Sequence, residues 1–275
     1  MHPDLTQPGI IRLGSGGFGT TYRLSGGGSN GRAQIIKLMP ARGLRARLSA
    51  RLGQQMGNIA ALSHHQDMVT ISGWGAREDR WFVAFEEAPG GSLQQFVDAG
   101  VALEWQSVVR LGVQVAAVLE LAHDLGLLHR DVKPANILLS ADGRPLLTDL
   151  GLGTLSCSFS LDSASAAASL AVAAPEAART MALTPAADIF ALAATLRLLL
   201  GARRGPTPQR GDAPASLFDV LDEATARDPR DRHPSMSSLR ADLELLVDRR
   251  WRRPLRFTGV LNDDVNERDA VRWAG

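Results

Sequence analysis

The eight residues from His129 to Asn136 limit what this chain can fold into more than any other stretch, because one short loop carries three different reactive groups. Asp131 is followed two positions later by Lys133 and five positions later by Asn136, after an apolar run with helical spacing. A carboxylate can orient a hydroxyl and accept its proton, an ammonium can neutralise a transferring phosphoryl group, and an amide oxygen can ligate Mg²⁺. The spacing predicts a phosphoryl-transfer loop; the alternative is a polar turn between a helix and a strand.

Length and charge set loose limits on the kind of protein. The 275 residues suffice for one two-lobed catalytic domain with a short tail and leave little room for a second module. Thirty lysines and arginines balance 29 aspartates and glutamates, so the net charge of +1 gives no reason to expect nucleic acid as a partner. Cys157 is the only cysteine, which excludes an intrachain disulfide.

The sequence predicts a cytoplasmic protein without a membrane span. Residues 1–4 lack the basic segment and apolar core that begin a secretory signal. The most apolar stretch, residues 189–200, is interrupted by Arg197 and is shorter than the roughly 20 apolar residues that a span requires.

Hydrophobic periodicity predicts an α+β fold with two lobes. Strands are expected at 10–13, 20–24, 33–38, 69–74 and 81–85, with one helix at about 44–62. Helices are expected at 105–125, 188–200, 217–226 and 236–247. The predicted organisation is an N-terminal extension (1–9), an antiparallel β lobe with one helix (10–85), a hinge (86–92), a mainly helical lobe (93–247) and a C-terminal tail (248–275).

A glycine-rich segment between the first two predicted strands suits phosphate binding, because residues without a Cβ let the backbone approach closely. It comprises Gly14, Ser15, Gly16, Gly17, Phe18 and Gly19. A Rossmann turn has a similar glycine spacing but opens a helix, whereas residues 20–24 are typical of a strand. Lys37 ends a strand about twenty residues later, and Asp149 follows the apolar pair Leu146-Leu147 with a glycine two positions on.

In this order the motifs resemble the eukaryotic-type (Hanks-type) serine/threonine protein kinases, in a bacterial-like form. The resemblance implies transfer of the γ-phosphate of ATP to a protein hydroxyl, with Asp131 and Lys133 catalytic and Lys37 on the α- and β-phosphates. It assigns Mg²⁺ to Asn136 and Asp149. It also implies a nucleotide site in which Phe85 is the gatekeeper, the backbone of Glu86 and Ala88 pairs with adenine, and Leu13, Thr21, Ile35, Gln55 and Leu138 complete the walls.

Three further positions match structural anchors of that family. Glu176 ends the Ala-Pro-Glu that closes the activation segment, Arg232 lies where its ion-pair partner is expected, and Asp188 should hold the catalytic loop.

Arg130 could pair with a phosphate on the activation loop. The candidate acceptors are Thr154, Ser156, Ser158, Ser160, Ser163 and Ser165. Aminoglycoside-type phosphotransferases share the acid and the asparagine but lack the Lys-Pro pair and this glycine loop.

The chain departs from the family pattern at several positions. Gln55 replaces the helix glutamate that pairs with the strand lysine, so no countercharge is supplied there. Ile35 stands where a small alanine usually lies over adenine, and Ser169 where a threonine contacts the catalytic acid. Residues 170–173 lack the usual Gly-Thr-Pro and tyrosine. These changes predict reduced activity, and a pseudokinase that binds a partner is the alternative. The arginines and Trp251 at 249–253 suggest either a solvated helix end or a docking segment.

Overall fold

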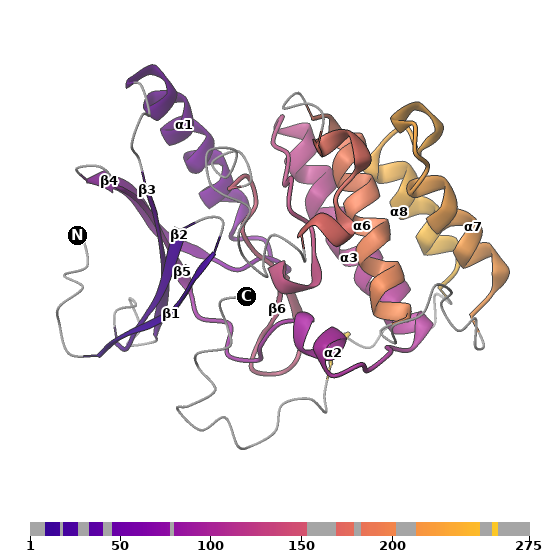
Figure 1. Ribbon diagram of the computed structural model, residues 1–275, viewed down its shortest axis with the longest axis horizontal. Helices are drawn as coiled ribbons and strands as arrows, with labels where there is room; N and C mark the ends of the chain where they lie inside the picture. Colours follow the sequence, from indigo (N-terminus) through magenta and orange to yellow (C-terminus); the bar gives the residue numbers. More distant parts are fainter. Residues whose placement is uncertain are drawn as a thin grey trace.

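A computed structural model describes residues 9–16, 19–26, 33–40, 46–77, 80–152, 169–178, 183–201, 213–247 and 255–257. Within these ranges the chain forms a sheet lobe and a helical lobe, which lie side by side in Figure 1. This arrangement confirms the predicted α+β bilobal fold.

The first lobe is a five-stranded antiparallel sheet with one helix. Its strands follow the order β1-β2-β3-β5-β4. Their bounds are β1 (Ile10–Gly16), β2 (Gly19–Leu24), β3 (Gln34–Pro40), β4 (Ile71–Arg77) and β5 (Arg80–Glu86). Helix α1 (Ala46–Leu62) buries Met56 and Ile59, three residues apart on one helical face. All five predicted strands and the helix are present.

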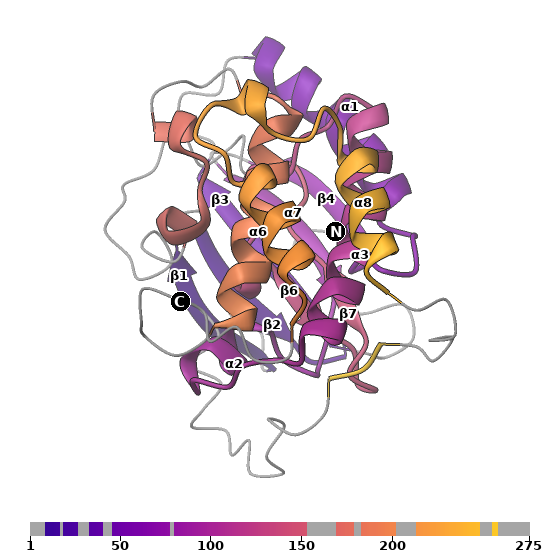
Figure 2. The same cartoon turned by 90° about the vertical axis from the view of Figure 1, so that its right-hand side faces the viewer.

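The second lobe packs three longer helices around a fourth, α6 (Pro185–Leu200). The others are α3 (Trp105–Asp124), α7 (Ala215–Ala224) and α8 (Met236–Leu245), and α6 contacts all three. Ten residues of α6 are buried, as expected for a helix that is apolar all round. Figure 2 shows α6, α7 and α8 in front of the sheet. The four predicted helices are confirmed to within three residues at each end.

Several short elements complete the helical lobe, and some of them carry the candidate site. They are α2 (Gln94–Asp98), the 3₁₀ turns η1 (Pro134–Asn136), η2 (Pro175–Ala178) and η3 (Pro229–Asp231), and the hairpin of β6 (Ile137–Leu139) and β7 (Pro145–Leu147). Periodicity missed α2 and β6 because five and three residues are too few to show a repeat.

The strand predicted at 69–74 was wrong at its start, since β4 begins at Ile71. Met68 forms a parallel bridge with Leu147, and the backbone N–H of Val69 donates to the Leu147 carbonyl at 2.9 Å. The residues before β4 therefore join the two lobes instead of extending the sheet.

Residues 255–257 pack against the helical lobe. Leu255 and Phe257 are 3% and 5% exposed and belong to its core. Residues 248–254 and 258–275, which include Trp251, lie outside the described ranges, as do the candidate acceptors at 154–165.

None of the described helices is long and apolar enough to cross a membrane.

Candidate active site

The predicted phosphoryl-transfer loop brings its three side chains together. The Asn136 amide donates to Asp131 at both the backbone carbonyl (2.7 Å) and Oδ2 (2.9 Å). The Lys133 ammonium lies 3.1 Å from the same Oδ2. All three side chains are at least 90% buried. The carboxylate is thus held by a cation and an amide in one orientation, as a positioned proton acceptor requires.

Asp188, at the start of α6, holds the backbone of this loop. Its two carboxylate oxygens accept hydrogen bonds from the backbone N–H groups of His129 (2.9 Å) and Arg130 (2.8 Å). The predicted role of Asp188 as a tether is therefore confirmed. Arg130 has φ of 70°, a left-handed conformation that few residues other than glycine adopt, so the loop backbone needs such support.

The ionised form of Asp188 is stabilised despite its burial. Burial alone would raise its pKa, but the hydrogen bond from His123 (2.9 Å), the electrostatic interaction with His129 and two backbone N–H groups outweigh it and lower the pKa below its usual value. Sequence reasoning missed His123, because the 65 residues between it and Asp188 leave no local signal.

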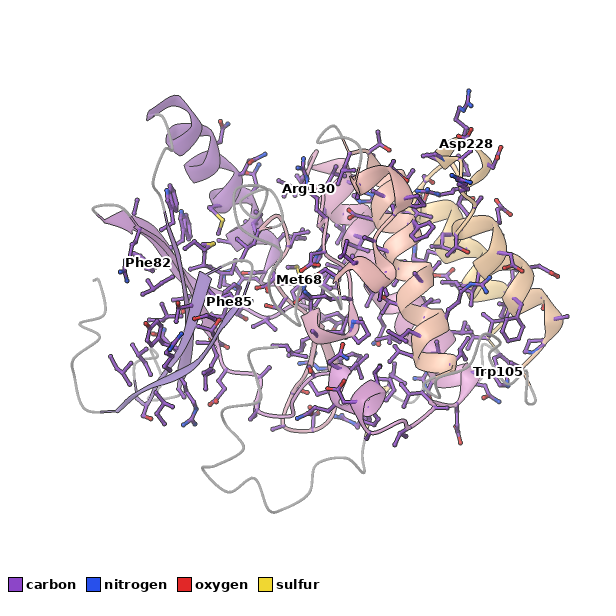
Figure 3. All side chains as sticks on the ribbon, in the orientation of Figure 1. Met68, Phe82, Phe85, Trp105, Arg130 and Asp228 are labelled. Atoms are coloured by element: carbon purple, nitrogen blue, oxygen red, sulfur yellow. The ribbon has the colours of Figure 1, made fainter. Side chains whose placement is uncertain are left out.

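Buried contacts from two further elements complete the loop's support. The His129 imidazole, fully buried, lies 2.9 Å from the Thr148 carbonyl just before Asp149, and its Nδ1 accepts from the Asp131 N–H at 3.3 Å. Thr195 on α6 donates to the Val132 carbonyl at 3.2 Å. Figure 3 shows Arg130 at the edge of the helical lobe that faces the sheet.

Lys37 and Asp149 come together from opposite lobes. The Lys37 ammonium, on β3, forms a hydrogen-bonded ion pair with Oδ2 of Asp149. It also lies 6.0 Å from the ring centroid of Phe85, which points toward the interior of the sheet lobe in Figure 3. Gln55 on α1 is half-buried, and no hydrogen bond joins it to Lys37 among the described contacts. The lysine therefore takes its countercharge from Asp149.

Asp149 and Asn136 fit the expected metal site. Oδ1 of Asp149 is buried and has no hydrogen-bond partner among the described residues. The Asp149 backbone has φ of 64°, which places the carboxylate at a strained turn after β7. The described part of the chain has no group of three or more histidine, cysteine or acidic side chains placed to hold a metal ion. One carboxylate and one amide suit Mg²⁺, which usually keeps several waters and takes few protein ligands.

The inner face of the sheet forms the other wall of the candidate nucleotide site. Thr21 lies opposite Lys37, and Ile35 lies opposite Phe85, so these four residues share one face. Ile35 and Phe85 therefore place two large apolar side chains side by side. Leu13 on β1 is buried, and Leu138 on β6 is half-buried.

The glycine-rich hairpin is described in part. Gly14, Ser15 and Gly16 pair with β2, whereas Gly17 and Phe18 lie outside the described residues. Gly19 has φ of 116°, and a Cβ there would lie 2.0 Å from the Leu38 carbonyl oxygen. Only glycine fits at this position.

The hinge residues leave a free backbone donor. The Glu86 N–H donates to the Thr70 carbonyl and the Glu87 N–H to Ala33, but the Ala88 N–H has no partner among the described residues. Pairing of this donor with adenine stays a prediction. Glu87 also accepts two hydrogen bonds from Arg23 on β2, at 2.6 and 3.2 Å, which sequence reasoning missed. These bonds raise the pKa of the Arg23 guanidinium.

Contacts of the activation segment agree with the expected anchors. Arg232 makes a bidentate pair with Glu176 at 2.7 and 2.8 Å. Burial opposes ionisation of Glu176, but the hydrogen bonds from Arg232 lower its pKa. Lys133 donates to the Ser169 hydroxyl at 2.7 Å, which connects this segment to the transfer loop.

Comparison with known proteins agrees with this geometry. The protein kinase domain profile matches residues 10–249. Serine/threonine-protein kinase PknK of Mycobacterium tuberculosis is 32% identical over 85% of this chain and 23% of its own length. The probable serine/threonine-protein kinase PknB of Lactococcus lactis is 26% identical over 94% of this chain and 44% of its own length. Serine/threonine-protein kinase PrkC of Bacillus subtilis is 27% identical over 70% of this chain and 33% of its own length.

This chain thus spans less than half the length of each of these relatives. The profile nevertheless covers most of the chain, and its motifs meet in one buried site. The chain belongs to the Hanks-type serine/threonine protein kinase family.

Proposed function

We propose that this chain transfers the γ-phosphate of ATP to a serine or threonine hydroxyl of a protein. The observation that carries the proposal is the convergence of Lys133 and Asn136 on the buried carboxylate of Asp131. In the reaction a P–O bond forms to the acceptor hydroxyl oxygen, the bond between the γ-phosphorus and the β–γ bridging oxygen breaks, and ADP leaves. The hydroxyl proton passes to Asp131.

Each remaining residue has a role set by its position. Lys133 neutralises charge on the transferring group, and Lys37 holds the α- and β-phosphates. Asn136 and Asp149 would hold Mg²⁺, which when bound would neutralise developing charge on the phosphates. The Ala88 N–H and the Glu86 backbone would pair with adenine between Leu13 and Leu138.

We infer reduced activity, because two features weaken the nucleotide site. Lys37 is held by Asp149, so a bound metal and the lysine share one carboxylate. Ile35 opposite Phe85 narrows the space for the base. These features also favour the second candidate function, a pseudokinase that works by binding a partner. Pairing of Arg130 with a phosphate on the activation loop remains a prediction. A cytoplasmic location remains a prediction too.

The side chain that accepts phosphate tests the proposal directly. Acid hydrolysis of the labelled product should give phosphoserine or phosphothreonine and no phosphotyrosine. In cells, the effect of the protein should be lost in Asp131→Asn. An effect that survives this substitution at equal protein abundance would favour the pseudokinase.

A further inference from the structure

The described C-terminal residues close on the turn that joins β6 to β7. The N–H of Phe257 donates to the Gly143 carbonyl at 2.8 Å. Gly143 has φ of 78°, and a Cβ on it would lie 2.4 Å from the Phe257 carbonyl oxygen. The two backbones therefore approach so closely that only glycine fits in the turn.

The side chains of the two residues before Phe257 strengthen this contact. Leu255 is 3% exposed and enters the same apolar core. Arg256 forms an ion pair with Asp142, the residue before Gly143. Hydrogen bonds from Ser140 and Arg256 lower the pKa of Asp142 to about 2.

The segment also contacts α2, which follows the hinge. The Phe257 ring packs edge to face against Phe96 with centroids 6.0 Å apart. Phe96 is the buried residue of α2. Residues 255–257 thus contact both α2 and the β6–β7 turn.

These two elements support the hinge-side wall of the nucleotide site. The Gly90 N–H donates to the Leu139 carbonyl (2.8 Å), and the Leu139 N–H donates to the Gly91 carbonyl (2.7 Å). Leu138, a predicted contact of adenine, bridges to Ser92. The segment that leaves the hinge (residues 90–92) therefore rests on β6, whose position depends on the turn at Gly143.

We propose that Leu255, Arg256 and Phe257 form a C-terminal clasp that holds β6, residues 90–92 and α2 in the geometry that binds the nucleotide. Phe257 is a positioning residue, acting through Phe96 and Gly143. The clasp lies beyond residue 249, where the match to the kinase domain profile ends. The effect of the clasp on nucleotide affinity rests on the proposed function, whereas its effect on the hinge does not.

Hydrogen exchange in the full chain tests the clasp without any need for catalysis. Phe257→Ala should speed exchange of the Gly90 and Leu139 amides about tenfold or more, which corresponds to about 1.4 kcal/mol of lost protection. Leu245→Ala on α8 is the control, because Leu245 is 82% exposed. Phe257→Leu, which keeps an apolar side chain, should restore most of the protection. Unchanged exchange in folded Phe257→Ala would overturn the proposal.

A charge swap covers the case in which Phe257→Ala does not fold. Arg256→Asp should speed exchange at the same amides, and adding Asp142→Arg should restore it. An equal effect of the single and double variants would contradict the clasp.

Nucleotide affinity is the second readout. Phe257→Ala should weaken binding of a fluorescent ATP analogue about threefold to tenfold, whereas Leu245→Ala should not. Unchanged affinity in Phe257→Ala would show that the clasp does not support nucleotide binding. A wild-type chain that binds no nucleotide would refute the proposed function instead, and the exchange experiment would still decide on the clasp.

Discussion

Lys37 on the sheet lobe takes its countercharge from Asp149, which follows β7 in the other lobe. Kinases of this family usually hold the strand lysine with a glutamate from the helix of the first lobe. Here that helix offers the neutral Gln55. One carboxylate therefore has two tasks, since Asp149 is also the predicted metal ligand.

A carboxylate at position 55 should relieve this double use. Gln55→Glu is expected to raise the rate of phosphate transfer by about tenfold, equivalent to about 1.4 kcal/mol of transition-state stabilisation. Gln54→Glu is the matched control, because Gln54 is the neighbouring residue on α1 and is exposed. Steady-state rates at saturating ATP measure the difference. Equal rates for both variants would show that the missing charge does not limit transfer.

Ile35 should limit nucleotide affinity. Ile35→Ala removes bulk opposite Phe85 and is expected to lower the Kd for ATP about threefold to tenfold. The next residue, Ile36, is 3% exposed in a separate apolar cluster that includes Leu38 and Ala84. Ile36→Ala should cost about 2 kcal/mol of unfolding free energy and leave the Kd unchanged. Calorimetric titration distinguishes the two, and weaker binding in Ile35→Ala would contradict the account.

Arg232 should contribute far more stability than the nearby Arg230. The Arg232 side chain is fully buried and contacts Glu176, three backbone carbonyls and the Phe190 ring, whereas Arg230 is 88% exposed. Arg232→Lys is expected to cost about 3 kcal/mol of unfolding free energy, because the bidentate geometry is lost inside the protein. Arg230→Lys should leave the free energy of unfolding nearly unchanged, because solvent screens an exposed ion pair. Denaturant titration measures both, and similar losses would refute this ranking.

Asp188 should make stability depend on pH. Its folded pKa is lowered, so its contribution is present above the unfolded value of about 3.9 and is lost as the pH falls through the folded value. Asp188→Asn should cost about 3 kcal/mol at pH 7, and the gap to wild type should shrink below about pH 4. Asp222→Asn, with 67% exposure, is the control. A gap independent of pH would mean that ionised Asp188 does not stabilise the fold.

Local patterns were enough to predict the regular elements of this fold. Helix α3 spans 20 residues with apolar positions at regular helical steps, so its start was correct and its end was one residue off. The strand predicted at 69–74 began two residues too early because Met68 and Val69 pair with Leu147, far along the chain. No local pattern could indicate that competition.

The candidate site shows the same limit. Spacing and motif order identified Lys37, Asp131, Asn136 and Asp149, because each lies in a short, recognisable segment. The partner of Lys37 depends on a contact across 112 residues, and the contact of Arg256 with Asp142 spans 114. Such contacts follow from the packing of the two lobes and leave no mark in neighbouring residues.

Phosphate transfer from γ-labelled ATP with Mg²⁺, compared between wild type and Asp131→Asn, tests the central claim most directly. The account predicts self-labelling or labelling of a generic basic protein by wild type, and a loss of at least about 100-fold in Asp131→Asn, since a positioned proton acceptor contributes about 10² to 10⁴ in rate. Both proteins should show the same cooperative unfolding. No labelling by folded wild type and Gln55→Glu, or equal labelling by wild type and Asp131→Asn, would contradict the account.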